Sequence, residues 1–199
     1  MESRKEFFER HASGWDHHLN YGEKQQQLAE VASWFAVKKE EFILDVGTGT
    51  GVLLPYLVEA VGPRGKVAAM DFSFNMLKQA KRRDLAGDQT LVNAGVAAIP
   101  FLSGQFDRVT CFSAFPHFPD KRKALDEMVR VLKKDGYLFI AHLHSVEEIN
   151  RLHETTGGAV RVDRLPDPET LRTMMHSSGL HALSIVNKPG KFLAEGRKT

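Results

Sequence analysis

The chain has 199 residues, 42% of them hydrophobic, which is enough for one α/β domain with a buried core and too few for two comfortable ones. Its formal charge of +2 is small, and its lysines and arginines are scattered without aromatic residues between them, which disfavours a nucleic-acid partner. Cys111 is the only cysteine, which excludes an internal disulfide, and no apolar run approaches the ~20 residues of a membrane span, so we expect a cytoplasmic protein without a membrane partner.

Residues 1–22 are rich in aromatic residues and histidine but carry only a broken helical pattern. We expect this segment to be a mobile N-terminal cap, and residues 23–199 to form a single domain. An amphipathic helix is predicted from residue 23, because apolar residues recur there at helical spacing. These residues are Leu28, Val31, Ala32 and Phe35.

Residues 42–51 organise the rest of the chain. A short apolar run meets Asp45 and then three glycines at alternating positions, Gly47, Gly49 and Gly51. This pattern predicts the first strand of a parallel sheet and a turn whose bare backbone lets a ligand approach closely. A helix is predicted directly afterwards, so its free amide groups and the positive end of its dipole face the same turn.

Strands and helices then alternate. Further strands are predicted at 66–71, near 90–93, at 106–112 and at 137–141, with a closing hairpin of 181–187 and 191–195. Helices are predicted at about 75–83, over the periodic positions Leu125 to Leu132, from the capping-box residue Ser145, and from Asp167 to Gly179, with an irregular crossing at 151–166. The alternation predicts an α/β fold with a doubly wound, Rossmann-like, seven-stranded and mostly parallel sheet that ends in an antiparallel hairpin.

Sheets of this kind bind ligands at the carboxyl ends of their strands. A dinucleotide fingerprint requires the glycine pattern G-x-G-x-x-G, but its third position falls on Val52 or Leu54, depending on the frame. Both frames fail, which disfavours a nucleotide-dependent oxidoreductase. The pattern present instead is an acid followed by three alternating glycines, with a second acid, Asp71, closing the next strand.

Motifs at ordinary spacing follow one another between about Glu41 and His144. They are residues 44–51, residues 67–71 with 73–77 behind them, residues 99–101, residues 106–109 and residues 124–133. Together they resemble the class I S-adenosylmethionine-dependent methyltransferases, especially the small-molecule branch that includes the ubiquinone and menaquinone methyltransferases. The resemblance implies transfer of a methyl group from S-adenosylmethionine to a small-molecule acceptor.

The resemblance also implies how the methyl donor is held. Gly47 and Gly49 would let the backbone lie against its methionine and ribose portions, and Asp45 would face the methionine ammonium, directly or through water. Asp71 would accept hydrogen bonds from the ribose hydroxyls, a role that also suits an acceptor-only carboxylate at the end of the second strand. Phe72 and Met76 would flank the adenine. The implied contacts are Asp45, Gly47, Thr48, Gly49, Gly51, Asp71, Phe72, Met76 and Val96.

One family position departs from the pattern. An acid usually stands five residues before the position of Pro100 and contacts the adenine amino group, but this chain has Gly95 there. A backbone amide near Val96 can still meet the adenine ring, so we expect adenine to be recognised differently rather than lost. The same departure is the one feature that favours an alternative, a catalytically inactive methyltransferase-like binding or regulatory protein.

Methyl transfer from a sulfonium is an in-line displacement that needs the nucleophile held on axis, with a general base if the acceptor is a hydroxyl or an enolisable carbon. His117, His142 and His144 are therefore candidate bases or acceptor-binding residues, and His153 is a further candidate by position. Period two places His142 and His144 on one side of an extended segment. Ordinary polar packing remains open for these histidines, and metal binding is the least favoured interpretation, so no metal is expected.

The acceptor cannot be identified from the residues, and neither can the oligomeric state. The aromatic residues of the cap fit two roles equally, an apolar lid over the acceptor or packing of the first helix onto the sheet. These aromatic residues, with two from the loop after the fourth strand, are Phe7, Phe8, Trp15, Tyr21, Phe115 and Phe118.

Overall fold

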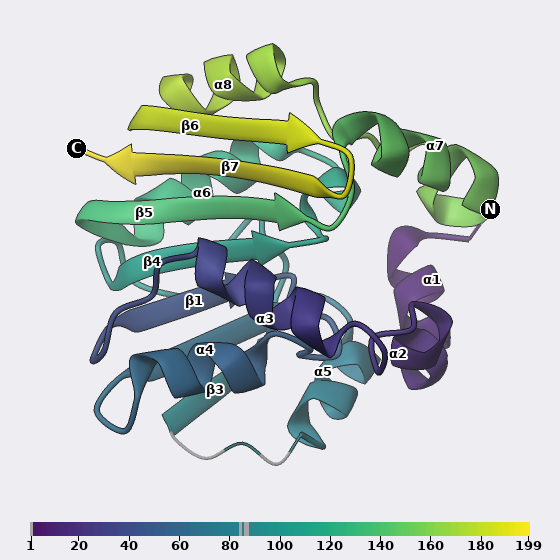
Figure 1. Cartoon of the computed structure of the whole chain (residues 1–199), viewed down its shortest axis with the longest axis horizontal. Coiled ribbons are helices and arrows are strands. Elements are labelled where there is room, and N and C mark those ends of the chain that lie inside the picture. Colours follow the sequence, from purple (N-terminus) through teal and green to yellow (C-terminus); the bar gives the residue numbers. More distant parts are fainter. Residues whose placement is uncertain (1, 84, 86–87) are drawn as a thin grey trace.

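The computed structural model describes residues 2–83, 85 and 88–199. Its sheet has seven strands in the order β3-β2-β1-β4-β5-β7-β6 (Figure 1). The first five are parallel, and β7 runs antiparallel to both β5 and β6. The strands are β1 (Phe42–Val46), β2 (Lys66–Asp71), β3 (Asp88–Asn93), β4 (Phe106–Phe112), β5 (Leu132–His142), β6 (Leu180–Lys188) and β7 (Lys191–Lys198). The predicted fold class, including the closing hairpin, is confirmed.

The helices form a layer on each face of the sheet. Figure 1 shows α3 and α4 crossing in front of the strands, with α6 behind them. The α-helices are α1 (Arg4–His11), α2 (Trp15–His18), α3 (Gln25–Trp34), α4 (Leu54–Val61), α5 (Phe74–Lys81), α6 (Lys121–Val131), α7 (Val146–Thr156) and α8 (Pro168–Ser177). Short 3-10 helices are η1 (Ala12–Gly14), η2 (Phe115–His117) and η3 (Gly158–Val160). None of the helices described is long and apolar enough to cross a membrane.

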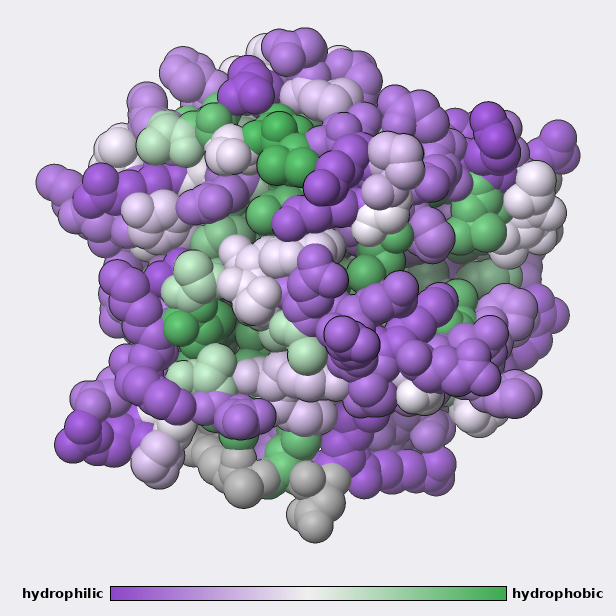
Figure 2. All heavy atoms as spheres, viewed as in Figure 1, coloured by the Kyte–Doolittle hydropathy of each residue, from purple (hydrophilic) through white to green (hydrophobic). Residues whose placement is uncertain are grey.

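Alternating side chains of the buried strands build two cores, one on each face of the sheet. Ile43 and Val67 belong to the core under α3 and α4. Leu44 and Ala68, one position along on the same strands, belong to the core that includes residues of α6 and α8. Cys111 is buried in this second core, as its apolar run indicated. Hydrophilic residues dominate the outer face drawn in Figure 2, with separate smaller apolar areas between them.

Several boundaries differ from the sequence predictions, most clearly at three places. Residues 4–18 are helical rather than broken, because Ser3 and Glu6 form a capping box that starts α1. Leu132 belongs to β5 and not to the preceding helix, since it pairs with Phe106 across the sheet. The irregular crossing expected from residue 151 begins only after Thr156, where α7 ends. The capping box at Ser145 and the N-cap of α8 at Asp167 are confirmed.

The carboxyl ends of the parallel strands all lie at one edge of the sheet. In Figure 1, α1, α2 and α7 gather at this edge, on the side of the molecule that also carries the N-terminus. The helix α1 packs against α5 and η3. The N-terminal segment therefore closes over the edge at which a doubly wound sheet binds its ligands.

Candidate active site

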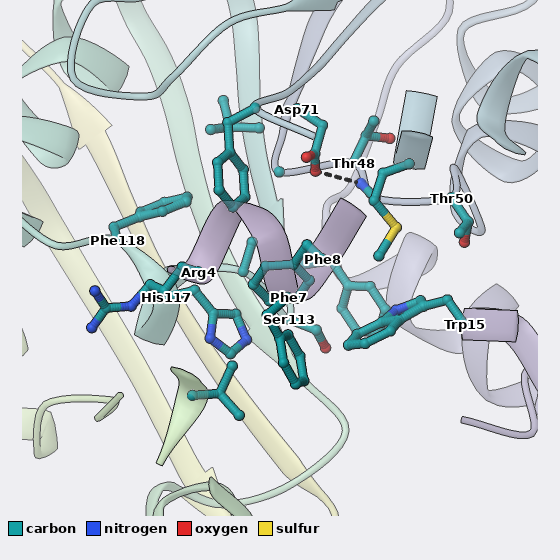
Figure 3. Close-up of a pocket in the computed structure, with 18 of the residues that line it drawn as sticks. Arg4, Phe7, Phe8, Trp15, Thr48, Thr50, Asp71, Ser113, His117 and Phe118 are labelled. Atoms are coloured by element: carbon teal, nitrogen blue, oxygen red, sulfur yellow. Dashed lines mark hydrogen bonds between the residues drawn. The ribbon is translucent and has the colours of Figure 1, made fainter. Parts of the chain in front are cut away.

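A cavity of about 640 Å³ occupies this edge. Its floor is the glycine turn after β1 and the end of β2, and its far wall comes from η2, the end of β5 and α7. Its roof comes from α1 and α2. Figure 3 shows Asp71 and Thr48 on one side of the pocket and His117 and Arg4 on the other, with Phe7 and Phe8 between them.

The glycines of the turn have different surroundings. A Cβ atom at Gly47 would stand 2.4 Å from the Cβ of Ala114, so the close approach of β1 and the loop after β4 requires glycine. A Cβ atom at Gly49 would meet nothing within 4 Å, because this residue faces the open cavity. Gly51 does not line the cavity and packs against Ala80 of α5 instead. The turn thus presents Gly47, Thr48 and Gly49 to a ligand.

Asp71 is the acid at the end of β2 and lines the cavity floor. Its Oδ2 accepts a hydrogen bond from the Gly49 amide at 2.9 Å, and its Oδ1 accepts one from the Ser73 amide at 2.8 Å. Burial raises its pKa to about 6, with smaller contributions from the charges of Asp45 and Glu9, while the two amides oppose the rise. Each oxygen keeps a lone pair for hydroxyl donors from a ligand.

Asp45 lies behind the turn and does not line the cavity. It is 2% exposed, and its Oδ1 accepts a hydrogen bond from the Thr110 hydroxyl at 2.7 Å. Burial raises the pKa of Asp45, and this hydrogen bond opposes the rise. A contact of Asp45 with the methionine ammonium, directly or through water, stays a prediction.

The predicted adenine-side residues come together beside Asp71. Phe72, Met76 and Val96 all line the cavity, and so does Gly95, whose missing side chain leaves open space. The loop that carries Val96 is held from α6, where Glu127 accepts a hydrogen bond from the Ile99 amide at 2.8 Å. The structure thus brings these residues together in the cavity that Asp71 also lines, and their contact with adenine stays a prediction.

Histidines from three elements line the far wall. His117 ends η2, His142 ends β5 and His153 lies on α7. The ring centroids of His117 and His153 are 4.9 Å apart. His142 is buried, and its Nε2 has no hydrogen-bond partner. Burial lowers the pKa of His142 well below its usual value and also lowers the pKa of His153, so both rings are neutral at pH 7.

His144 stands apart from this group. The strand β5 ends at His142, so the alternation of extended backbone does not continue to His144. The side chain of His144 is 50% exposed at the cavity rim, with its Nδ1 4.0 Å from Glu148 Oε2. His142 and His144 nevertheless both line the cavity, and so does His153, so a shared role for these rings stays a prediction.

Comparison with known proteins agrees with this geometry. Residues 44–140, from β1 into β5, match the family described as a methyltransferase domain. The ubiquinone/menaquinone biosynthesis C-methyltransferase UbiE of Cronobacter sakazakii is 28% identical over 79% of this chain and 73% of its own length. This chain is an S-adenosylmethionine-dependent methyltransferase that resembles UbiE.

Solved structures agree with the methyltransferase fold. A SAM-dependent methyltransferase from Aquifex aeolicus has a TM-score of 0.70 at 23% identity, covering 86% of this chain and 89% of that chain. A chain from the complex of the Haloferax volcanii Trm112 methyltransferase activator has a TM-score of 0.81 at 20% identity, covering 99% of this chain and 98% of its own. The second match therefore includes the N-terminal cap as well as the sheet.

Side-chain hydrogen bonds hold both helices of the roof, α1 and α2, in place, and sequence patterns did not reveal the residues that form them. Asp16 accepts hydrogen bonds from the Thr50 hydroxyl and from Arg83, which ties α2 to the glycine turn. Glu9 accepts hydrogen bonds from the first amides of α5, those of Phe74 and Asn75, at 2.7 and 2.9 Å. Because these partners are distant in the chain, no local spacing could have predicted them.

The aromatic residues of the cap pack against one another and against α5, and they also line the cavity. Phe7 and Phe8 are buried in a small cluster with Met76, and they also line the cavity with Trp15. The Phe8 ring lies edge-on to His117 at a centroid distance of 5.0 Å. The cap thus packs on α5 and η3 and also lines the cavity, and its role as a lid over the acceptor stays a prediction.

Asp163 is the other residue that sequence patterns missed. It lies after η3, is 1% exposed, and its Oδ2 is 2.7 Å from His117 Nδ1. Its Oδ1 accepts a hydrogen bond from Arg4 Nε at 2.7 Å, and its backbone oxygen is 3.0 Å from His153 Nδ1. Over the part of the chain that the structure describes, no group of three or more His, Cys, Asp or Glu residues is arranged to hold a metal ion.

Proposed function

We propose that this methyltransferase transfers the methyl group of S-adenosylmethionine to a small, flat and largely apolar acceptor. One observation carries the proposal: a single cavity joins the glycine turn and Asp71 to the histidine wall, under an aromatic roof. The donor end and the acceptor end of a transfer reaction would thus lie within one cavity, which would hold the reacting atoms close together.

The residues at the donor end fit S-adenosylmethionine. Asp71 is an acceptor-only group with a free lone pair on each oxygen, which suits a pair of ribose hydroxyls. Gly49 leaves open space beside that carboxylate, and Phe72 and Met76 supply apolar surface for a base. When bound, S-adenosylmethionine supplies an electrophilic methyl group on a sulfonium sulfur.

The residues at the acceptor end determine the kind of molecule that fits. Phe8, Phe118 and Leu143 line this end with apolar surface, and histidines including His117 and His142 add polar atoms. The named relative acts in ubiquinone and menaquinone biosynthesis, and a quinone-like ring has the same combination of a flat apolar body and polar oxygens. We therefore place ring-shaped, quinol-type molecules first among candidate acceptors.

Binding and turnover test the proposal separately. Calorimetric titration with S-adenosylhomocysteine should show one site with a dissociation constant in the micromolar range, and Asp71→Ala should weaken it at least tenfold. Asp126→Ala, which removes an exposed carboxylate from α6, is the matched control and should bind normally. No binding of S-adenosylmethionine or S-adenosylhomocysteine at millimolar concentration would refute the donor assignment.

Turnover is measured by transfer of a radiolabelled methyl group from S-adenosylmethionine to a panel of acceptors. The panel should hold hydroquinones and naphthols, with aliphatic amines and a short RNA for comparison. We expect label on the ring compounds. Labelling of RNA alone would overturn the proposed acceptor class while leaving the donor assignment intact.

A further inference from the structure

Asp163 orients two imidazole rings. Its carboxylate and its backbone carbonyl are both acceptors, one for His117 Nδ1 at 2.7 Å and one for His153 Nδ1 at 3.0 Å. Each Nδ1 must therefore carry a hydrogen, so Nε2 is the nitrogen of each ring that can accept a hydrogen bond or a proton. His142 contributes a third ring to the cavity wall, with a buried Nε2 that has no partner.

Only His117 of these three rings has a carboxylate partner. His153 is bonded to a carbonyl, and burial lowers the pKa of both His142 and His153, so neither of them is suited to hold an added proton. Burial alone would raise the pKa of Asp163, but hydrogen bonds from His117 and Arg4 hold it below its usual value. An ionised carboxylate is thus in place to stabilise a proton taken up by His117.

We propose that His117 Nε2 accepts the proton that the methyl acceptor loses, and that Asp163 is the residue that positions His117 for this step. The inference rests on the proposed function and narrows its substrate to a molecule with a weakly acidic O–H group, such as a phenol or an enol. The methyl group is then transferred either to that oxygen or to a carbon conjugated with it. The bare Nε2 atoms require a hydrogen-bond donor, and the apolar walls require a ring or chain of low polarity.

The step balances with the groups named. The O–H bond of the acceptor breaks, its hydrogen goes to His117 Nε2, and the electron pair of the acceptor forms the new bond to the methyl carbon. The carbon–sulfur bond breaks with its electron pair going to sulfur, which becomes a neutral thioether. One positive charge has then moved from the sulfonium to the imidazolium of His117, beside the Asp163 carboxylate.

Arg4 connects this pair to the roof. Its guanidinium comes from α1 and bonds the second oxygen of Asp163, so the carboxylate is buried only together with a compensating charge. The charged and titratable groups around His117 are Arg4 of α1, Asp163, Lys121 of α6, His142 of β5 and His153 of α7. The pair is therefore complete only when α1 is seated on the cavity.

A chromogenic phenol tests the proton transfer without turnover. Enzyme loaded with S-adenosylhomocysteine is titrated with 4-nitrophenol, whose ionised form absorbs at longer wavelength than its neutral form. In the wild type, bound probe should ionise at a pH at least one unit below that of free probe. In His117→Gln and Asp163→Asn the probe should bind with a dissociation constant within about threefold of wild type, but without the shift.

The second test measures kcat and KM with a phenol or quinol that the enzyme methylates. His117→Gln should lower kcat about 100-fold, and Asp163→Asn should lower it about 10-fold to 100-fold, with KM changed less than about threefold. The acid limb of the kcat profile should move to lower pH in Asp163→Asn, because Asn lacks the charge that stabilises the protonated ring. Arg4→Gln should lower kcat by a smaller factor.

Controls separate positioning from folding. Asp167→Asn, which changes the N-cap of α8 outside the cavity, should leave kcat and the probe shift unchanged. If Asp163→Asn loses its melting transition or its S-adenosylhomocysteine binding, His117→Gln decides the question alone, since its carboxylate partner is retained.

Two results would overturn the inference while leaving the proposed function standing. The first is normal binding of S-adenosylhomocysteine with an unshifted probe and an unchanged pH profile in His117→Gln. The second is one equivalent of tightly bound transition metal in the purified enzyme that is lost in both His117→Gln and His153→Gln. Absence of any S-adenosylhomocysteine binding would instead refute the proposed function itself.

Discussion

The backbone amide of Gly49 donates a hydrogen bond to the Oδ2 of Asp71 at 2.9 Å, across 22 positions of the chain. This contact joins the turn after β1 to the end of β2 at the point where the ribose of a methyl donor would lie. The carboxylate is buried and already bonded to backbone before any ligand arrives, so the donor end of the cavity is preorganised.

The raised pKa of Asp71 predicts a pH-dependent affinity for S-adenosylhomocysteine. Because its folded-state pKa of about 6 lies above the usual value, the free folded chain holds this proton more tightly than the unfolded chain does. The contribution of protonated Asp71 to the stability of the ligand-free fold is therefore full below about pH 4 and is lost as the pH rises through 6.

Ligand affinity should change in the opposite direction, because ribose hydroxyls donate to the ionised form of Asp71. The dissociation constant for S-adenosylhomocysteine should fall up to about tenfold per pH unit between pH 5 and 6, then level off. Calorimetric titration from pH 5 to 8 measures this dependence. The Asp71→Asn variant should bind S-adenosylhomocysteine weakly and with little pH dependence. A flat profile in the wild type would contradict the assignment.

Two alanine substitutions should separate the ligand-facing glycine from the packing glycine. At Gly49, where φ is +56° and the added Cβ meets no atom, alanine should cost about 1 kcal/mol of stability and raise the dissociation constant for S-adenosylhomocysteine at least tenfold. At Gly51 the added Cβ would lie 2.9 Å from Leu54 Cδ1 and 3.0 Å from Ala80 Cβ, so alanine should lower the free energy of unfolding by about 1–3 kcal/mol. Urea unfolding and calorimetry measure the two effects. If the two variants were equally stable and lost S-adenosylhomocysteine binding equally, the assignment of Gly49 to ligand binding and Gly51 to packing would be wrong.

Asp16→Asn should loosen the roof without unfolding the domain. The substitution removes the charge that holds Arg83 and weakens the tie to Thr50, so residues 1–22 should be cleaved several-fold faster by trypsin. The pair is partly exposed, so the free energy of unfolding should change by less than about 1 kcal/mol. S-adenosylhomocysteine should protect the wild-type segment more than the variant. Glu2→Gln, which removes an exposed ion pair with Arg10 in the same segment, is the control and should behave as wild type.

Arg130→Met should destabilise the loop that carries the adenine side of the cavity. Arg130 donates to the carbonyls of Ile99 and Phe101 at 2.8 and 2.9 Å and pairs with Glu127, so its loss leaves several acceptors without a donor. We expect a loss of about 1–3 kcal/mol at pH 7 by urea unfolding. The hydrogen bond from Arg130 lowers the pKa of Glu127, so the stabilisation is present at neutral pH and lost as the pH falls below the ordinary range of a glutamate. The difference between wild type and variant should therefore shrink in acid to the part due to the two carbonyl hydrogen bonds, whereas a constant difference down to pH 3 would count against the ion pair.

Much of the fold followed from short-range patterns. The alternation of Ile43 and Leu44 between two cores, the capping box of Ser145, and the N-cap of Asp167 each depend on residues within a few positions of one another. The donor end of the site was predicted for the same reason, since the glycine turn and Asp71 occupy fixed places at the ends of adjacent strands. Errors occurred where a local pattern competed with a distant partner, as at Leu132, which satisfies a helical spacing but pairs with Phe106.

The α/β class and the methyltransferase activity could be predicted from the sequence, because they depend on periodicity and on motif spacing along single segments. The same motifs predict which residues surround the methyl donor. The acceptor end, in contrast, depends on tertiary contacts. Arg4 and Asp163 are 159 positions apart, and His117 and Asp163 are 46 apart, so no spacing in the chain relates them. Their contact exists because α1 folds back over the sheet edge and α7 returns the chain to it, and side-chain hydrogen bonds across such distances form only in the folded protein.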